Sequence, residues 1–151
     1  MILAVKREVA TTGSEKKLYR WVFLMKKSSK GYLRKMIKKN SDMTRKTVEH
    51  MRDGKGSVDQ MLILDGRDMA KHARLFGMMT LDKGCSIGLH THTKETEYYF
   101  ILAGEGIVTE ADGDKPVSKG DVVITGDGES HAIRNEGTAP LVFIALIVLD
   151  D

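Results

Sequence analysis

From residue 58 onward, apolar and polar positions alternate in short runs, which is the spacing expected of half-buried β-strands. Asp112-Gly113, between two of these runs, is a strong signal for a tight turn. The runs are residues 58–64, 73–81, 86–92, 97–103, 105–111, 121–125, 131–135 and 141–148. Eight or so short strands at this spacing predict an all-β fold, a jelly-roll (double-stranded β-helix) barrel.

The stretch ahead of these runs gives weaker signals. Ser41 or Asp42 can cap a short helix or turn, and Thr47, Val48 and Met51 follow at roughly helical spacing. We therefore expect a short irregular or helical N-terminal extension ahead of the barrel.

Residues 1–35 show neither convincing periodicity nor strands bounded by turns. The only dense apolar run, Trp21 to Met25, is too short for a membrane-spanning helix or the core of a signal peptide. We expect a basic, poorly ordered extension over these residues. A single domain then covers residues 36–151, with its barrel core at about 70–149.

The net charge of +3 conceals an asymmetry along the chain. Residues 1–46 hold 14 Lys and Arg against 3 Asp and Glu, which leaves 10 basic and 18 acidic residues for the rest. One interpretation of this start is a basic arm for nucleic acid or a membrane surface. We favour a tail without that role and expect neither partner. A natural start of the protein at Met25 or Met36 is a further interpretation.

With 151 residues, 41% hydrophobic and 30% charged, the chain has the size and composition of one soluble globular domain. Its single cysteine, Cys85, excludes an internal disulfide, which favours a reduced, cytoplasmic setting. If the strand is regular from that point, Cys85 faces away from His90 and His92. We therefore do not expect it to bind metal.

Three of the five histidines fall into one constellation with an acid. His90 and His92 are two residues apart, so both imidazoles leave the same face of a strand. Glu97 opens the next strand, and His131 lies in a second glycine-containing segment. Three imidazoles and one carboxylate suit a divalent transition metal such as Fe, Mn, Zn, Ni or Cu.

The glycines around these residues have a characteristic spacing. The first segment reads Gly84, five residues, His-x-His, four residues, Glu97, six residues, Gly104. The second reads Gly120, five residues, Gly-x-Gly, two residues, His131, three residues, Asn135. Together the two segments resemble the two motifs of the cupin superfamily. The second motif of that family commonly has Pro where this chain has Gly126, and glycine can serve the same bend through a positive φ.

The resemblance implies that His90, His92, Glu97 and His131 are the ligands of one divalent metal ion. It is closest to the small, single-domain, oxalate-decarboxylase-like cupins. In that family, strands ahead of the barrel often pack against it or join the sheet of a partner, so a homodimer is expected.

Two further residues are candidates for binding a small-molecule substrate. Tyr99 shares the Glu97 face of its strand and can donate a hydrogen bond, although a packed aromatic ring is the plainer interpretation. Arg74 can reach inward to a carboxylate, or it can be an exposed residue at a strand start. On a regular strand, Ser86 and Gly88 share the histidine face and leave room above the metal.

We expect a metal-dependent small cupin that binds or transforms a small polar metabolite, carboxylate- or sugar-like. The open reaction classes are decarboxylation, dioxygenation and isomerisation. A non-catalytic sensor or storage module is the alternative, because no acid or base is identified beyond the ligands: Glu129 reads as a solvated loop residue. A DNA-binding regulator ranks last, because residues 1–60 present no helix-turn-helix.

Overall fold

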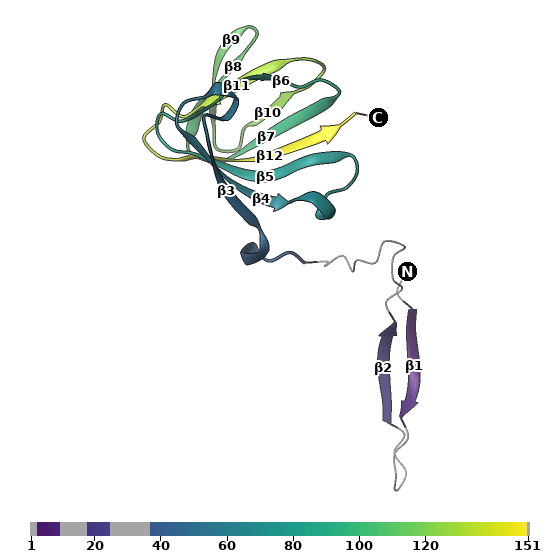
Figure 1. Ribbon diagram of the computed structural model, residues 1–151. Helices are drawn as coiled ribbons and strands as arrows, with labels where there is room; N and C mark the ends of the chain where they lie inside the picture. Colours follow the sequence, from purple (N-terminus) through teal and green to yellow (C-terminus); the bar gives the residue numbers. More distant parts are fainter. Residues whose placement is uncertain (1–2, 10–17, 25–36, 151) are drawn as a thin grey trace. The chain divides into compact units, whose positions relative to one another are not determined.

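The computed structural model describes residues 3–9, 18–24 and 37–150, and the chain divides into two compact units, Met1–Ile37 and Lys38–Asp151 (Figure 1). In the first unit, β1 (Leu3–Val9) pairs antiparallel with β2 (Leu18–Leu24). No strands were expected there; β2 holds Tyr19, Trp21, Val22 and Phe23, residue types that favour strands, whereas β1 has only Val5 and Val9 of these types. The expectation of poor order over residues 1–35 stays a prediction, and residues 1–2, 10–17 and 25–36, which include the alternative starts at Met25 and Met36, fall outside the described residues.

The second unit is built from two antiparallel sheets, so the predicted all-β jelly-roll architecture is confirmed. The larger sheet has the order β10-β7-β12-β5-β4-β3 and the smaller one β6-β11-β8-β9 (Figure 1). The strands of the larger sheet are β3 (Thr44–Glu49), β4 (Ser57–Leu64), β5 (Ala73–Leu81), β7 (Glu95–Ala103), β10 (Val122–Thr125) and β12 (Leu141–Leu149). Those of the smaller sheet are β6 (Ser86–Thr91), β8 (Glu105–Glu110), β9 (Gly113–Ser118) and β11 (Ser130–Arg134).

Alternating side chains from both sheets form one core. Along β7, Glu97, Tyr99 and Ile101 are buried while Tyr98 and Phe100 are exposed, as the two-residue period of a strand requires. The smaller sheet contributes Ile87, Val108 and Ile133, and the larger one Met79, Leu81, Leu141 and Phe143. Each such side chain stabilises the fold by about 1.5–3 kcal/mol relative to an exposed one.

The segment expected to be helical or irregular forms a strand instead. Thr44–Glu49 is β3, which extends the larger sheet by pairing with β4 in a register that sets Thr47 opposite Asp59. The Thr47 hydroxyl donates to the Asp59 carboxylate at 2.5 Å. The free edge of β4 offers backbone hydrogen bonds that an isolated helix of this length cannot match. Within residues 37–150 the helical segments are three short 3-10 turns, η1 (Asn40–Asp42), η2 (Met51–Asp53) and η3 (Gly66–Asp68), and Arg52 in η2 has left-handed backbone angles.

A bulge in β6 decides which of its residues face the interior. His131 pairs with His90, but Ile133 pairs with Ile87, so two residues of β6 lie opposite one of β11. The side-chain alternation therefore shifts, and Ile87 is buried on the histidine face. The expectation that Ser86 and Gly88 share that face was wrong, because it assumed a regular strand.

The backbone of β6 is held against the η2 turn. The Ser86 amide donates to the Lys55 carbonyl at 2.9 Å, and the Lys55 amide donates to the Ser86 hydroxyl at 2.8 Å. A Cβ on Gly88 would lie only 1.9 Å from the Arg52 carbonyl oxygen. This close approach fixes the strand that carries the first candidate ligands.

No helix among the residues that the structure describes is long and apolar enough to cross a membrane.

Candidate metal centre

The four residues singled out in the sequence come together between the two sheets. His90 lies on β6, His92 directly follows that strand, Glu97 lies on β7 and His131 on β11. One candidate ligand atom from each of the four lies within 4.8 Å of all the others. The three Nε2 atoms surround Glu97 Oε2 at 3.4 Å for His90, 3.0 Å for His92 and 3.0 Å for His131.

The environment favours the protonation states that a metal requires. Burial raises the pKa of Glu97, but the opposite effect of its polar contacts with His131, His90 and Tyr99 is larger and lowers this pKa to about 2. Burial also lowers the pKa of His131, which more than offsets the opposite effect of Glu97. The cluster therefore combines an ionised carboxylate with at least one imidazole that resists protonation, and metal ions bind deprotonated ligands.

One nitrogen of the cluster, His92 Nε2, lacks a hydrogen-bond partner, and a metal ion would bind it instead. His92 Nε2 is buried without a hydrogen-bond partner, the one such side-chain atom among the described residues, although it lies 3.0 Å from Glu97 Oε2. A buried polar nitrogen without a partner costs about 1–3 kcal/mol. A divalent ion among these atoms would remove that cost, so the residues fit the predicted metal.

Each imidazole is oriented by a partner on its other nitrogen. His90 Nδ1 lies 2.9 Å from the Gly88 carbonyl oxygen, and His131 Nδ1 lies 2.8 Å from the Thr125 hydroxyl. His92 Nδ1 lies 2.8 Å from Glu95 Oε1. A carbonyl or carboxylate oxygen can only accept, so His90 and His92 carry their protons on Nδ1 and turn the Nε2 lone pair toward the cluster.

The two predicted substrate residues contact the cluster or its supports. Tyr99 is buried, and its ring stacks on that of His131 with centroids 5.0 Å apart and planes at 20°. It is also hydrogen-bonded to Glu97. Arg74 forms a two-pronged ion pair with Glu95. As groups that bind substrate, both stay predictions.

The sequence analysis missed two supporting residues and considered others that lie outside the cluster. Glu95 could have been found, because it precedes Glu97 by two residues and so shares its face of the strand. Thr125 gave no signal before the fold was known. Cys85 and Glu129 are not part of the cluster, as expected, and Glu129 is exposed in its loop.

The bend at Gly126 does not use the conformational freedom that glycine offers. Positive φ angles occur instead at the next two residues, Asp127 and Gly128. What Gly126 provides is space, because a Cβ there would lie 2.6 Å from the Thr96 hydroxyl. The expectation of a positive φ at this position was wrong.

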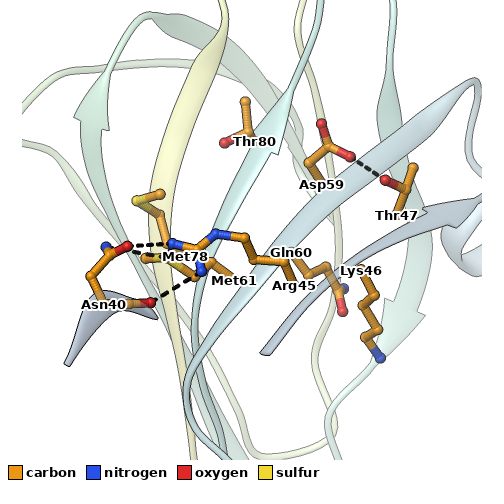
Figure 2. Close-up of a pocket in the computed structure, with 9 residues that line it drawn as sticks. All are labelled: Asn40, Arg45, Lys46, Thr47, Asp59, Gln60, Met61, Met78 and Thr80. Carbon is orange, nitrogen blue, oxygen red and sulfur yellow. Dashed lines mark hydrogen bonds between the residues drawn. The ribbon is translucent and has the colours of Figure 1, made fainter. Parts of the chain in front are cut away.

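A separate hollow of about 660 Å³ lies over β3, β4 and β5 (Figure 2). Arg45 spans it and donates to Asn40 Oδ1 at 2.6 Å (Figure 2). Met61, Met78 and Thr80, which point away from the core, line it. None of the four candidate ligands does, so the hollow is distinct from the metal centre.

Comparison with protein families gives a match to the cupin domain over residues 77–147. An oxalate-binding protein of Thermotoga maritima is 43% identical over 114 residues, which are 76% of this chain and 94% of that protein. A gentisate 1,2-dioxygenase of a Ralstonia species is 35% identical over 81 residues, which are 53% of this chain but only 22% of the dioxygenase.

Among solved structures, a predicted oxalate decarboxylase of Thermotoga maritima is similar with a TM-score of 0.71 and 43% identity. The similarity covers 76% of this chain and 99% of that one. A cupin 2 conserved barrel domain protein of Rhodopseudomonas palustris has a TM-score of 0.59 at 17% identity, over 72% of this chain and 74% of that one. The latter likeness extends to the fold alone.

Proposed function

Because the chain belongs to the cupin family, we propose that it binds a small polar metabolite through a divalent metal ion held by His90, His92, Glu97 and His131. The observation that carries the proposal is the convergence of four ligand atoms, one of which, the buried His92 Nε2, has no hydrogen-bond partner. A bound ion would supply Lewis acidity toward an oxygen of the ligand. Mn, Fe, Zn and Ni are among the metals that this ligand set suits.

A carboxylate, with oxalate as the first compound to test, is the ligand class we propose. Its support is the 43% identical relative, whose name records oxalate binding. The residues around the cluster suit an anion only when a metal is present, since Glu97 is ionised and would otherwise repel it. The protein groups therefore hold and neutralise the ion, and the ion attracts the carboxylate.

Binding without turnover is the second candidate function, and one observation favours it. Each acid in contact with the cluster is already engaged: Glu97 by the His131 imidazole and Glu95 by Arg74. Neither is free to move a proton to or from a substrate, as decarboxylation or isomerisation would require. A sensor or storage module needs no such group.

Elemental analysis of protein purified without added metal or chelator tests the proposal. We expect about one equivalent of a divalent transition metal, and a large loss in a His90→Ala, His131→Ala double variant that remains folded by circular dichroism. No metal in the wild type and none taken up on titration would overturn the proposed site.

Calorimetric titration of the metal-loaded protein with oxalate then tests the ligand class, with the chelator-treated protein as control. Binding that requires the metal supports a carboxylate ligand, and release of CO2 above that of free metal would identify a decarboxylase. Binding without turnover would favour the non-catalytic function. No binding of oxalate at millimolar concentration would contradict the proposed ligand class.

We also propose that the protein is a cytoplasmic homodimer. The free thiol of Cys85 agrees with a reducing compartment. The support for a dimer is a set of exposed apolar side chains on the outer face of β7 and β10, namely Tyr98, Phe100, Val122 and Ile124. Contiguous exposed apolar patches often mark protein–protein contact sites, and these four residues lie on two strands that pair directly, Val122 opposite Phe100 and Ile124 opposite Tyr98.

Sedimentation analysis of the wild type and of a Phe100→Ser, Ile124→Ser variant tests this assignment. We expect a dimer that the double substitution converts to a monomer, whereas Ile37→Ser, at another exposed apolar residue, leaves it dimeric. A monomeric wild type would contradict the dimer, and a dimeric double variant would exclude this face as the interface.

A further inference from the structure

A second bulge lies at the start of β5 and concerns Arg74. Ile147 of β12 pairs with Leu75, but Val148 pairs with Ala73, so Arg74 is the extra residue without a partner in the ladder. Bulges change the direction in which a side chain points. This one lets an arginine on β5 reach a residue of β7, although β12 lies between the two strands.

The residue that Arg74 reaches is Glu95, the first residue of β7. The Arg74 Nε donates to Glu95 Oε2 and its Nη2 to Glu95 Oε1, so both carboxylate oxygens are held. Glu95 Oε1 also accepts from His92 Nδ1 at 2.8 Å. The side chain of Glu95 is 11% exposed and that of Arg74 is 43% exposed, so the contact chain runs from solvent to a buried candidate ligand.

The two-pronged contact constrains more than a single charge would. A guanidinium that binds both oxygens fixes the plane of the carboxylate, whereas a lysine ammonium would leave it free to rotate. With its plane fixed, Glu95 Oε1 stays opposite His92 Nδ1. The imidazole then keeps one tautomer and one orientation, with the Nε2 lone pair directed into the cluster.

We propose that Arg74 and Glu95 are positioning residues that orient His92 for metal binding. The inference rests on the metal site proposed above but concerns residues outside its ligand set. It also gives Arg74 a role different from the substrate binding expected from the sequence. Glu95 likewise acts through His92 and does not itself bind the metal, because Arg74 occupies both of its oxygens.

Nuclear magnetic resonance of the metal-free protein provides a test that needs no metal. Correlation of the ring nitrogens with the ring protons distinguishes the two tautomers of a neutral histidine. We expect His92 to carry its proton on Nδ1 in the wild type and to populate the Nε2 form in Glu95→Ala. Retention of a single Nδ1 tautomer in that variant would contradict the proposed role of Glu95.

Competition with a chromophoric chelator, with Zn(II) as the probe, provides the second test. We expect Glu95→Ala to lower the Zn(II) affinity by about ten- to a hundredfold. Arg74→Gln should lower it by a smaller factor, and the affinity of Arg74→Lys should lie between those of Arg74→Gln and the wild type. Arg134→Gln is the matched control: Arg134 also pairs with carboxylates, its side chain is 32% exposed, and it contacts none of the candidate ligands. This control should bind Zn(II) as the wild type does.

The outcomes separate this inference from the proposed function. If the wild type binds no Zn(II), the metal site itself fails. If the wild type binds it and both Glu95→Ala and Arg74→Gln bind it equally well, only the positioning role fails. If Glu95→Ala does not fold, Glu95→Gln replaces it in the Zn(II) measurement. Glutamine keeps the size of the side chain and one acceptor oxygen but loses the ion pair with Arg74. Affinity that falls in parallel in the Arg134→Gln control would also overturn the inference.

Discussion

The ring of Tyr99 stacks on the imidazole of His131, with centroids 5.0 Å apart and planes at 20°, while its hydroxyl is hydrogen-bonded to Glu97. One buried side chain therefore supports two candidate ligands that come from different sheets. Burial, followed by the charge of Glu97, raises the pKa of Tyr99 well above its usual value. The phenol is thus a neutral hydrogen-bond donor throughout the physiological range.

Tyr99→Phe should keep the stacked ring and lose only the hydrogen bond. We expect the metal affinity to fall by about tenfold, because Glu97 loses the donor that helps to hold its carboxylate in place. Tyr99→Leu should in addition lower the free energy of unfolding by about 3 kcal/mol through the lost aromatic packing. Chelator competition and urea unfolding measure the two effects, and wild-type affinity in Tyr99→Phe would contradict the supporting role.

The stability of the metal-free protein should fall with pH in two windows. The pKa of His131 lies below its unfolded value, so the folded protein binds fewer protons and loses stability as the pH falls below about 6.5. The pKa of Glu97 is lowered from 4.5 in the unfolded chain to about 2 in the folded protein. The ionised carboxylate therefore makes its full contribution to the free energy of unfolding above pH 4.5 and loses it as the pH falls toward about 2.

Urea unfolding between pH 7 and pH 3, in the presence of chelator, measures these dependences. From the shift in its pKa, Glu97 should contribute about 3 kcal/mol at neutral pH. Glu97→Gln should therefore show a weaker fall in stability below about pH 4.5 than the wild type. Equal slopes for the two proteins in that range would show that the carboxylate is not held as described.

Asn135 should be important for stability and not for metal binding. Its side chain is fully buried, donates to the carbonyl oxygens of Leu81 and Ala139 at 2.8 and 2.9 Å, and accepts from the Gly137 amide at 2.9 Å. Asn135→Asp would place a carboxylate against two carbonyl oxygens, so we expect a loss of about 3 kcal/mol in the free energy of unfolding.

The same charge change at the exposed residue Asn40 is the control for that substitution, and Asn40→Asp should leave the stability nearly unchanged. Elemental analysis of folded Asn135→Asp should still give the metal content of the wild type. A variant of normal stability that has lost its metal would show that Asn135 acts at the metal centre.

Gly88→Ala should destabilise the protein, because its Cβ would lie 1.9 Å from the Arg52 carbonyl oxygen. Relief of that contact requires a shift of the β6 backbone, which we expect to cost about 2 kcal/mol or more. Gly137→Ala is the milder comparison, since its Cβ would lie 3.3 Å from Asn135 Oδ1, a tight contact that a shift of a few tenths of an ångström would relieve. Thermal unfolding compares the two, and equal midpoints would contradict the close packing of β6 against η2.

The candidate ligands were predictable because their spacing carries the information. His90 and His92 share a face wherever the backbone between them is regularly extended, whichever sheet the strand joins. The bounds of β5, residues 73–81, also agree with those expected from its apolar run. Patterns of this kind concern a single strand, so they can be interpreted without knowledge of the rest of the fold.

Features that depend on two elements were not predictable in the same way. The bulge in β6 arises from its pairing with β11, and it moves Ile87 onto the histidine face against the regular alternation. The bulge at Arg74 likewise arises from pairing with β12. Residues 44–49 form strand β3 because they pair with the edge of β4. This pairing outweighs the weak helical preference of the segment.

The division of the ligands between the sheets has a consequence for the rate of unfolding. His90 and His131 belong to the smaller sheet and Glu97 to the larger one, so a bound ion would join the two halves of the barrel at one point. The halves could then separate only after the ion had dissociated or a ligand had released it. We therefore expect the metal to slow unfolding, giving the protein a longer lifetime in the folded state as well as a higher midpoint.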